Sequence, residues 1–401
     1  MALRLLTAGE SHGPELTAVL EGFPAGMAVD MSALNLEMAR RQKGYGSGGR
    51  MKIEKDMAAI SAGVMDGRTT GGPIALRVPN LDYVKWRDRE LPPMTIPRPG
   101  HADLTGAVKY GYKELRLSLE RASARETAAR VAAAGLCKQL LDYFGILVGS
   151  YVTTIGQVSV NISSDIPYED RFAAAENNSV RCPDPGAAEK MEQHISEIMQ
   201  AKDTVGGVFE VAALGVPPGL GSYVQWDKRL DGLLLWVVAS IQAIKGVEIG
   251  PAFSNATKPG SEVQDEIFID EEGELYRESN NSGGFEGGIT TGEPIVVRAA
   301  MKPISTILNP RQSVDLANGQ AAPTNYERSD FCAVPRAAVV GEAMVAFVLT
   351  QALIEKLGGD SLEEMRPRFE SLRQMRLGDL PMDNTSWRFG YSEDQSSAPK
   401  K

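Results

Sequence analysis

Cysteine and histidine are scarce in this sequence, with three of each among 401 residues. Cys137, Cys182 and Cys332 are odd in number and lack metal-binding spacing, which argues against a disulfide framework or a cysteine-based zinc site. They predict reduced thiols in a cytoplasmic protein. Walker A, C-x-x-C and H-E-x-x-H motifs do not occur in the sequence, and we expect no metal site.

The sequence also lacks an excess of positive charge and any long apolar run. The formal net charge of −10 disfavours a general nucleic-acid interface, so an anionic ligand needs a locally basic pocket. The longest apolar run, residues 232–244, is too short to span a membrane and predicts a buried helix. The N-terminus becomes polar too soon for a signal peptide, which again favours a cytoplasmic location.

Glycine is abundant instead, with 41 residues, as is typical of tight turns and of backbone that approaches a ligand. Alternating apolar residues predict strands, and a 3.6-residue period predicts helices. The expected strands are 3–8, 15–23, 51–55, 57–65 and 73–80. The expected helices are 31–41 with Ser32 as N-cap, 121–144, 186–202, 230–244 and 336–359. The polar end, 391–401, predicts a disordered tail.

Three pairs of segments echo one another in the same order along the chain, at offsets of about 190–220 residues. Each echo alone is weak, because glycine and proline turns often look alike. Their shared order favours two related halves around a pseudo-twofold axis. The pairs are 67–77 with 288–298 (both G-x-T-T-G-x-P-I-x-x-R), 18–26 with 211–219, and the helices that follow Arg121 and Arg328.

The segment Gly9–Gly13 fits G-x-S-x-G, the pattern of a hydrolase nucleophile elbow. That elbow needs a strand before the serine and a helix after it. Residues 15–23 predict a strand, which disfavours Ser11 as a nucleophile. A serine hydrolase acting through Ser11 is one alternative function, and a non-catalytic protein that binds a phosphorylated metabolite is another.

The histidines differ in their surroundings. His12 and His101 lie in glycine-flanked loops, where an imidazole can exchange protons near neutral pH. Hydrogen bonding within the loop is the structural alternative for both. His194 lies within a predicted helix among glutamate and glutamine residues, and we expect it at the surface.

Four arginine clusters lie in glycine-, serine- or proline-rich contexts. Each one alone is typical of a solvated surface. Four of them in an acidic protein predict one polyanionic ligand, because guanidinium groups bind carboxylate and phosphate bidentately. The clusters are Arg40, Arg41 and Arg50; Arg98 beside His101; Arg121, Ser123 and Arg125; and Arg328, Ser329, Asp330 and Arg336.

Together these segments resemble the chorismate synthase family. The motifs occur in that family's order between residue 7 and about residue 345. They are GESHG, RRQKGYGSGGRM, RPGHAD, RASARETAARVAAAGL, SIQAIKG, GGFEGGITTGEPI, KPIST and RSDFCAVPRA. The resemblance implies a single catalytic domain over residues 1–390 and an α+β fold. That fold is a β-α-β sandwich with central helices between two antiparallel sheets, which agrees with the duplicated halves.

The resemblance also implies an activity. The family converts 5-enolpyruvylshikimate 3-phosphate to chorismate in the shikimate pathway of aromatic amino-acid biosynthesis. The reaction is an anti-1,4-elimination of phosphate that requires reduced FMN without net redox change. A homotetramer is implied as well. No NADPH-binding motif is visible in the sequence. We therefore expect an external reductase to reduce the flavin, rather than this chain reducing it with NADPH and releasing NADP.

Site residues carry over from the matching motifs. His12 is implied beside the departing phosphate, as proton donor or electrostatic partner, and His101 protonates or orients the reduced flavin. Asp330, with Ser11 in the same relay, assists flavin N5 in accepting the ring proton. The implied flavin contacts are Arg121, Ala122, Ser123, Gln242, Ala243, Gly287, Lys302, Pro303, Ile304, Ser305, Thr306 and Arg328. The implied substrate contacts are Arg41, Ser47, Arg50, Arg98, Arg125 and Arg336.

Ser47 is a departure from the family, which commonly has arginine at that position of the first arginine loop. One anion contact is therefore missing or supplied by a neighbour such as Arg50. We expect weaker phosphate or nucleotide binding at this loop. An unchanged substrate affinity after Ser47→Arg contradicts that expectation.

Overall fold

The computed structural model describes residues 3–47 and 55–387. Its first sheet is antiparallel, with strand order β1-β2-β6-β3. One face of this sheet is apolar and fully buried, because alternate residues of the two central strands point to the same side. Leu16, Ala18 and Leu20 of β2 lie on that face. The strands are β1 (Arg4–Ala8), β2 (Glu15–Glu21), β6 (Ile74–Pro79) and β3 (Ala59–Ala62).

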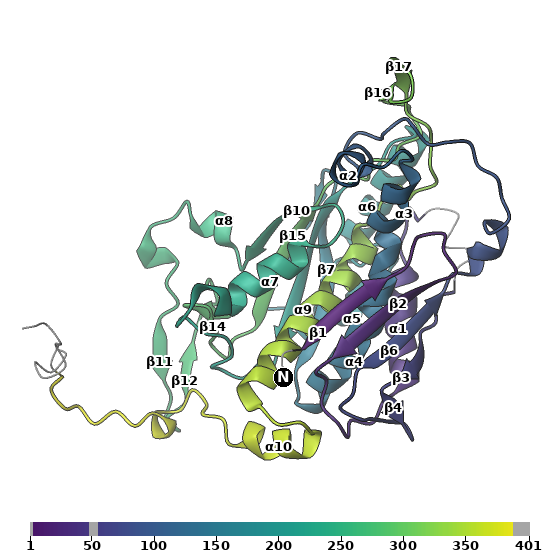
Figure 1. Ribbon diagram of the computed structural model, residues 1–401. Helices are drawn as coiled ribbons and strands as arrows, with labels where there is room; N and C mark the ends of the chain where they lie inside the picture. The colour runs from purple at the N-terminus through teal and green to yellow at the C-terminus, as the bar shows by residue number, and fades with distance from the viewer. Residues whose placement is uncertain (1–2, 48–54, 388–401) are drawn as a thin grey trace, which may run out of the picture.

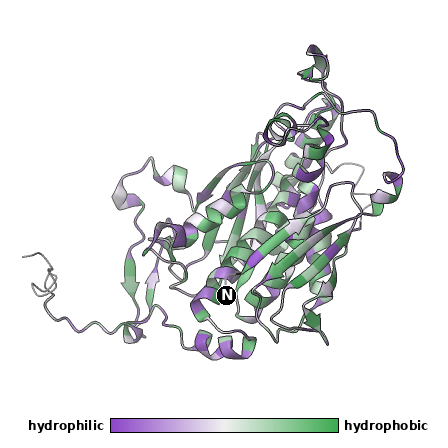
Figure 2. Cartoon of the chain, in the orientation of Figure 1, coloured by the Kyte–Doolittle hydropathy of each residue, from purple (hydrophilic) through white to green (hydrophobic). Residues whose placement is uncertain are grey.

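The second sheet is also antiparallel, with order β10-β15-β9-β7-β8. Its inner face is lined by apolar side chains such as Phe209, Val211 and Val297, which are fully buried. Figure 2 shows the strands of both sheets to be largely hydrophobic. The strands are β10 (Ile244–Ile249), β15 (Ile295–Met301), β9 (Gly207–Leu214), β7 (Leu147–Ile155) and β8 (Val158–Ser159).

Two long helices join the sheets into one core (Figure 1). Helix α4 (Thr127–Tyr143) packs against β2 and β6, and α9 (Val334–Leu357) packs against β7 and β9. The two helices also pack on each other, flanked by α1 (Met31–Gln42) and α7 (Leu230–Ala239). The described chain is therefore an α+β fold with several antiparallel sheets.

Shorter elements surround this core. The remaining helices are α2 (Asp103–Tyr110), α3 (Arg116–Ala122), α5 (Tyr168–Glu176), α6 (Pro185–Gln200), α8 (Ala252–Asn255) and α10 (Leu362–Glu370). Small two-stranded ribbons pair β4 (Val64–Met65) with β5 (Arg68–Thr69), β11 (Ile267–Ile269) with β12 (Leu275–Arg277), β13 (Phe285–Glu286) with β14 (Ile289–Thr290), and β16 (Gln312–Asp315) with β17 (Gln320–Pro323). Figure 1 shows β16 and β17 projecting from one end of the molecule.

The two T-T-G echoes form the same turn, one at the end of β5 and the other at the end of β14. Thr69 Oγ1 donates to the carbonyl of Pro24 at 2.6 Å and accepts the N–H of Met27 at 3.0 Å. Thr290 Oγ1 donates to the carbonyl of Pro217 at 2.7 Å and accepts the N–H of Leu220 at 2.9 Å. Both threonines are buried. The sequence echo therefore reflects a repeated hydrogen-bonding pattern, which satisfies two backbone groups at each turn.

Several predicted boundaries need correction. Asp30, rather than Ser32, caps α1, because its carboxylate accepts the N–H groups of Ser32 and Ala33. The helix predicted over 121–144 is interrupted: α3 ends at Ala122, a 3-10 turn follows, and α4 begins at Thr127. The helix predicted over 230–244 ends at Ala239, and the chain then enters β10.

Other predicted elements agree closely with the structure. Strands at 3–8, 15–23 and 73–80 and helices near 186–202 and 336–359 are present within a few residues. Most of the strand expected over 51–55, and all of the tail over 391–401, lie outside the described residues.

Helix α9 is long and apolar enough to cross a membrane by length and composition. However, 89% of its most apolar window is buried inside the molecule. It is therefore the central helix of a protein core.

Candidate functional site

A cavity of about 560 Å³ lies where six chain segments converge. These are the end of α1, the loop before α2, the turn between α3 and α4, the turn between α7 and β10, the segment after β15 and the start of α9. The volume of this cavity is typical of a small-molecule site. Five arginines and one lysine line it. They are Arg41, Arg98, Arg125, Arg328, Arg336 and Lys302.

Asp56 holds two of these arginines. Its carboxylate accepts two hydrogen bonds of 2.6 Å from Arg125 and one of 3.2 Å from Arg41. Arg41 also donates to Thr127, and Arg125 to Asn80. The Asp56 side chain is fully buried, so the two guanidinium groups are fixed from behind by a charge that water does not reach.

Arg98 and His101 share a second buried carboxylate, that of Asp103. Arg98 Nε donates to Asp103 at 2.8 Å, and the Nδ1 atom of His101 lies 2.6 Å from the other carboxylate oxygen. Burial alone raises the pKa of Asp103, but its hydrogen bonds with His101 and Arg98 hold that pKa well below its usual range. Arg98 also donates to Thr306 across the cavity at 2.9 Å.

The start of α9 supplies the last part of the basic wall. Arg336 pairs with Asp330, while its buried Nε has no hydrogen-bond partner within the described residues. Burial and the charge of Arg41 lower the pKa of Arg336 to about 9. Arg328 donates to Asp82 at 2.7 Å.

A second buried polar atom without a partner among the described residues is Gln242 Oε1. The amide nitrogen of Gln242 donates to Glu126 at 3.3 Å, which leaves the carbonyl oxygen as the free acceptor. Its neighbour Ala243 has φ of +67°, a left-handed conformation that costs an L-residue roughly 1–2 kcal/mol. Both residues line the cavity.

His12 lies outside the cavity lining, in the loop between β1 and β2. Its ring packs on Trp86, with centroids 4.2 Å apart, and its Nδ1 lies 2.7 Å from Glu120. Ser11 connects this loop to the cavity, because the hydroxyl of the lining residue Ser123 donates to Ser11 Oγ at 3.2 Å.

The nucleophile-elbow hypothesis is contradicted by this loop. Ser11 is followed by strand β2 (Glu15–Glu21) rather than by a helix. A hydrolase elbow places the serine on a strand-to-helix turn, so the geometry that exposes the nucleophile does not form here.

Most of the predicted site residues meet at the cavity, but not all do. Those in its lining are Arg41, Arg98, His101, Ala122, Ser123, Arg125, Gln242, Ala243, Lys302, Ile304, Ser305, Thr306, Arg328, Asp330 and Arg336. Those described but not in its lining are Ser11, His12, Ser47, Arg121, Gly287 and Pro303. Arg50 lies outside the described residues.

Gly287 and Arg121 have other surroundings. Gly287 lies in the turn between β13 and β14, where an added Cβ would approach Tyr223. Arg121 donates to the carbonyl and the hydroxyl of Thr7 at 2.9 and 3.0 Å.

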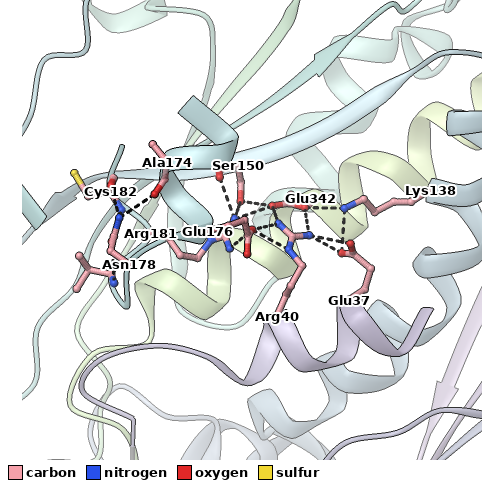
Figure 3. A network of polar contacts seen from close by, with 11 residues as sticks. Glu37, Arg40, Lys138, Ser150, Ala174, Glu176, Asn178, Arg181, Cys182 and Glu342 are labelled. Carbon is pink, nitrogen blue, oxygen red and sulfur yellow. Dashed lines mark hydrogen bonds and ion pairs between the residues drawn. The ribbon is translucent and has the colours of Figure 1, made fainter. Parts of the chain in front are cut away.

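Arg40, which belongs to the first predicted arginine cluster, is not in the cavity lining and lies in a buried ionic network (Figure 3). It pairs with Glu342 of α9 at 2.7 Å, and Lys138 and Arg181 reach the same carboxylate at 2.8 and 3.1 Å. Ser150 of β7 donates to it as well. Arg40 therefore fastens α1 to the core, and its charge is already compensated.

The residues that sequence reasoning missed are chiefly the acids that hold the basic side chains and the loops of the site: Asp56, Asp82, Asp103, Glu120 and Glu126. Periodicity gives no signal for them, because all except Asp103 have at least one partner far along the chain. The one local signal is the spacing within RPGHAD, where Asp103 follows Arg98 and His101. Within the described residues, no group of three or more histidine, cysteine, aspartate or glutamate side chains could hold a metal ion.

Comparisons with known proteins identify the family of the chain. The family model described as chorismate synthase matches residues 3–354. A chorismate synthase of Aquifex aeolicus is 52% identical over 92% of this chain and 96% of its own length. One of Sulfurihydrogenibium is 51% identical over 93% of this chain and 98% of its own. A crystal structure of chorismate synthase superposes with a TM-score of 0.76 at 46% identity, covering 92% of this chain and 97% of that one.

Proposed function

Because the chain belongs to the chorismate synthase family, we propose that its arginine-lined cavity holds 5-enolpyruvylshikimate 3-phosphate beside reduced FMN. The chain is a phosphate-eliminating lyase of the shikimate pathway. It forms chorismate by anti-1,4-elimination, without net redox change. The observation that carries the assignment to this cavity is the gathering of six basic side chains in a protein with a net charge of −10.

The cavity fits reduced FMN, the cofactor of this family. Gln242 Oε1 offers a buried acceptor for a ring N–H. Flavin contacts from Ala122, Ser123, Ala243, Lys302, Ile304, Ser305, Thr306 and Arg328 form part of the same proposal. When bound, reduced flavin supplies electron density to the substrate as phosphate departs and recovers it as the ring hydrogen leaves.

The substrate carries two carboxylates and a phosphate, and five arginines are proposed to bind them. Arg41, Arg98, Arg125 and Arg336 lie in the cavity lining, and Arg50, three positions after Ser47 in the sequence, lies outside the described residues. Preorganised guanidinium groups stabilise charge that develops on the leaving phosphate. Their fixed geometry also orients the ring for elimination.

Proton handling is assigned to two histidines and one acid. His12 is the proton donor or electrostatic partner of the leaving phosphate. His101, held by Asp103, orients or protonates the reduced flavin. Asp330 and Ser11 form the relay for the ring proton, and Ser11 is supported by its contact with Ser123 in the cavity wall.

Gly287, Arg121 and Pro303 are retained as proposed flavin contacts and Ser47 as a proposed substrate contact. Support for them is the family motif alone. Flavin binding by Gly287→Ala and Arg121→Ala variants tests the first two of these contacts, and wild-type affinity in a variant removes that residue from the site.

The decisive assay is anaerobic incubation of the protein with substrate and reduced FMN, followed by chorismate absorbance and free phosphate. We expect equimolar chorismate and phosphate. Absence of chorismate with bound substrate contradicts the proposed reaction.

His12→Ala is expected to retain substrate binding and lose turnover, because His12 acts on a proton rather than on affinity. Binding is measured by calorimetry and turnover by the same anaerobic assay. A loss of affinity with unchanged kcat contradicts this role.

Further statements complete the proposal. The chain works as a homotetramer in the cytoplasm, and an external reductase supplies the reduced flavin. Residues 1–390 form one catalytic domain. The fold is a β-α-β sandwich of two related halves. The repeated threonine turns and the equivalent pairing of Ile74 with Leu20 and of Ile295 with Ala213 support the last statement.

A further inference from the structure

Glu120 contacts the His12 loop at three points. One carboxylate oxygen accepts the backbone N–H of His12 at 2.7 Å, and the other lies 2.7 Å from Nδ1 of the same residue. The carbonyl oxygen of Glu120 accepts the N–H of Ser11 at 3.1 Å. Glu120 lies on α3, directly before the RASAR segment that enters the cavity wall. One residue therefore fixes both the backbone and the ring of His12.

This geometry determines where the ring carries its proton. An ionised carboxylate offers only lone pairs, so an imidazole nitrogen at hydrogen-bond distance must donate to it. We propose that Glu120 is a positioning residue that holds the proton of His12 on Nδ1, which leaves Nε2 as the nitrogen that exchanges a proton with the substrate. The second half of this proposal rests on the proposed function.

The other side of the ring is held as well. Trp86 packs on the imidazole at a tilt of 43°, and its indole N–H donates to Asp82 at 3.2 Å. The same Asp82 oxygen accepts from Arg328, which lines the cavity. Glu120 fixes the ring nitrogen, and Trp86 restricts rotation of the ring and ties it to the cavity wall. Both the His12 and Glu120 side chains are mostly buried, at 21% and 16% exposure, so water competes little for this contact.

The chain contains a matched comparison. All three histidines have Nδ1 facing a carboxylate: His12 with Glu120, His101 with Asp103 at 2.6 Å, and His194 with Glu197 at 3.6 Å. The last pair lies on α6, away from the cavity, and Glu197 is 60% exposed. Glu197→Gln therefore makes the same chemical change at a histidine outside the site.

The test is Glu120→Gln in the full-length chain labelled with 15N-histidine. The glutamine carbonyl can still accept the backbone N–H of His12, but its amide nitrogen can only donate to Nδ1, which drives the ring proton to Nε2. Nitrogen NMR reports this tautomer directly, and only three histidines contribute signals. His12→Ala identifies the signal of interest. In the parent protein we expect neutral His12 to carry its proton on Nδ1, and in the variant on Nε2.

Kinetics provide the second measurement. We expect Glu120→Gln to lower kcat by about 10²- to 10⁴-fold, as carboxylate-to-amide changes behind a catalytic histidine do, while KM changes little. The acidic limb of the kcat–pH profile should shift as well, whereas Glu197→Gln leaves kcat and its pH profile unchanged.

Two outcomes overturn the positioning role. One is a neutral His12 that carries its proton on Nε2 in the parent protein, a result that does not depend on the variant folding. The other is a folded Glu120→Gln variant whose tautomer and kcat match those of the parent. If the tautomer shifts but His12→Ala still turns over substrate, then Glu120 holds the ring as proposed and the catalytic role of His12 is what fails.

Discussion

At the scale of single residues, the site depends on acids that face away from the ligand. Asp56 is the clearest case, because its carboxylate lies between Arg41 and Arg125 and is fully buried. Without it, two buried guanidinium groups would repel each other across the cavity wall. The acid thus allows basic side chains to be concentrated before any anion is bound.

Asp56→Asn should therefore destabilise the ligand-free protein by about 3–5 kcal/mol, the usual cost of removing one partner from a buried ion pair. Substrate should stabilise the variant more than it stabilises the parent, because its anionic groups replace part of the lost charge. Urea unfolding with and without substrate measures both effects.

Asp88→Asn is the matched control, since Asp88 is 82% exposed and pairs only on the surface with Arg87. Its stability should stay close to that of the parent. Equal effects of the two substitutions would show that the buried position of Asp56 is not the cause.

The cysteines give a second prediction at this scale. Burial raises the pKa of the Cys137 thiol to about 12 and that of Cys332 to about 11, and it raises the pKa of Cys182 too. All three are free and at most 1% exposed. A thiol-specific reagent at mildly alkaline pH should label none of them in the native protein and all three after denaturation. Rapid labelling of a native thiol would contradict this.

At the scale of elements, helix α9 places a glutamate in the middle of an otherwise apolar core. Burial by itself raises the pKa of Glu342, but the charges of Arg40, Lys138 and Arg181 hold it well below its usual range. The folded protein therefore binds this proton less readily than the unfolded chain. The resulting stability is complete above the ordinary glutamate pKa and is lost as the pH falls below it.

Glu342→Gln should cost about 3–5 kcal/mol at neutral pH, because three cations lose their shared partner. The parent loses stability as the pH falls below the ordinary glutamate pKa, and the variant should lose less over the same pH range. Guanidinium unfolding across this pH range measures both. Glu355→Gln is the control on the same helix, since Glu355 is 61% exposed and pairs with an exposed lysine. A similar loss in both variants would contradict the role of burial.

Sequence reasoning located most elements because their apolar periodicity is strong, as in α9 and β2. It failed where local hydrogen bonds decide the boundary. Helix α4 begins at Thr127 because the chain first makes a 3-10 turn capped by Ser123, and periodicity does not report such a turn. The arginines of the cavity were identified because they cluster in glycine-, serine- or proline-rich segments that also match family motifs. Asp56 and Asp82 escaped notice because they contact arginines from distant parts of the chain.

At the scale of the whole molecule, the same threonine turn occurs twice, at Thr69 and at Thr290, which supports the two related halves that we propose. If the halves are equivalent, Thr69→Val and Thr290→Val should each lower the free energy of unfolding by about 1–3 kcal/mol, because each leaves a buried carbonyl and a buried N–H without a partner. Urea unfolding of the single variants measures the two costs.

Thr70→Val serves as the control, because Thr70 is exposed and its hydroxyl makes two longer bonds, to the carbonyl of Gly63 at 3.2 Å and from the N–H of Gly72 at 3.3 Å. We expect little change in that variant. A large cost in only one half would contradict equivalence of the two turns.

The carboxylates behind the cavity arginines have one more consequence, for the entropy of binding. Ordering a long, flexible side chain when a ligand arrives costs about 0.5–1.5 kcal/mol. Arg41, Arg98 and Arg125 are already ordered by Asp56 and Asp103, so that loss of rotamer freedom occurs when the chain folds. A polyanion then meets a rigid receptor, and its association should carry a small conformational-entropy penalty.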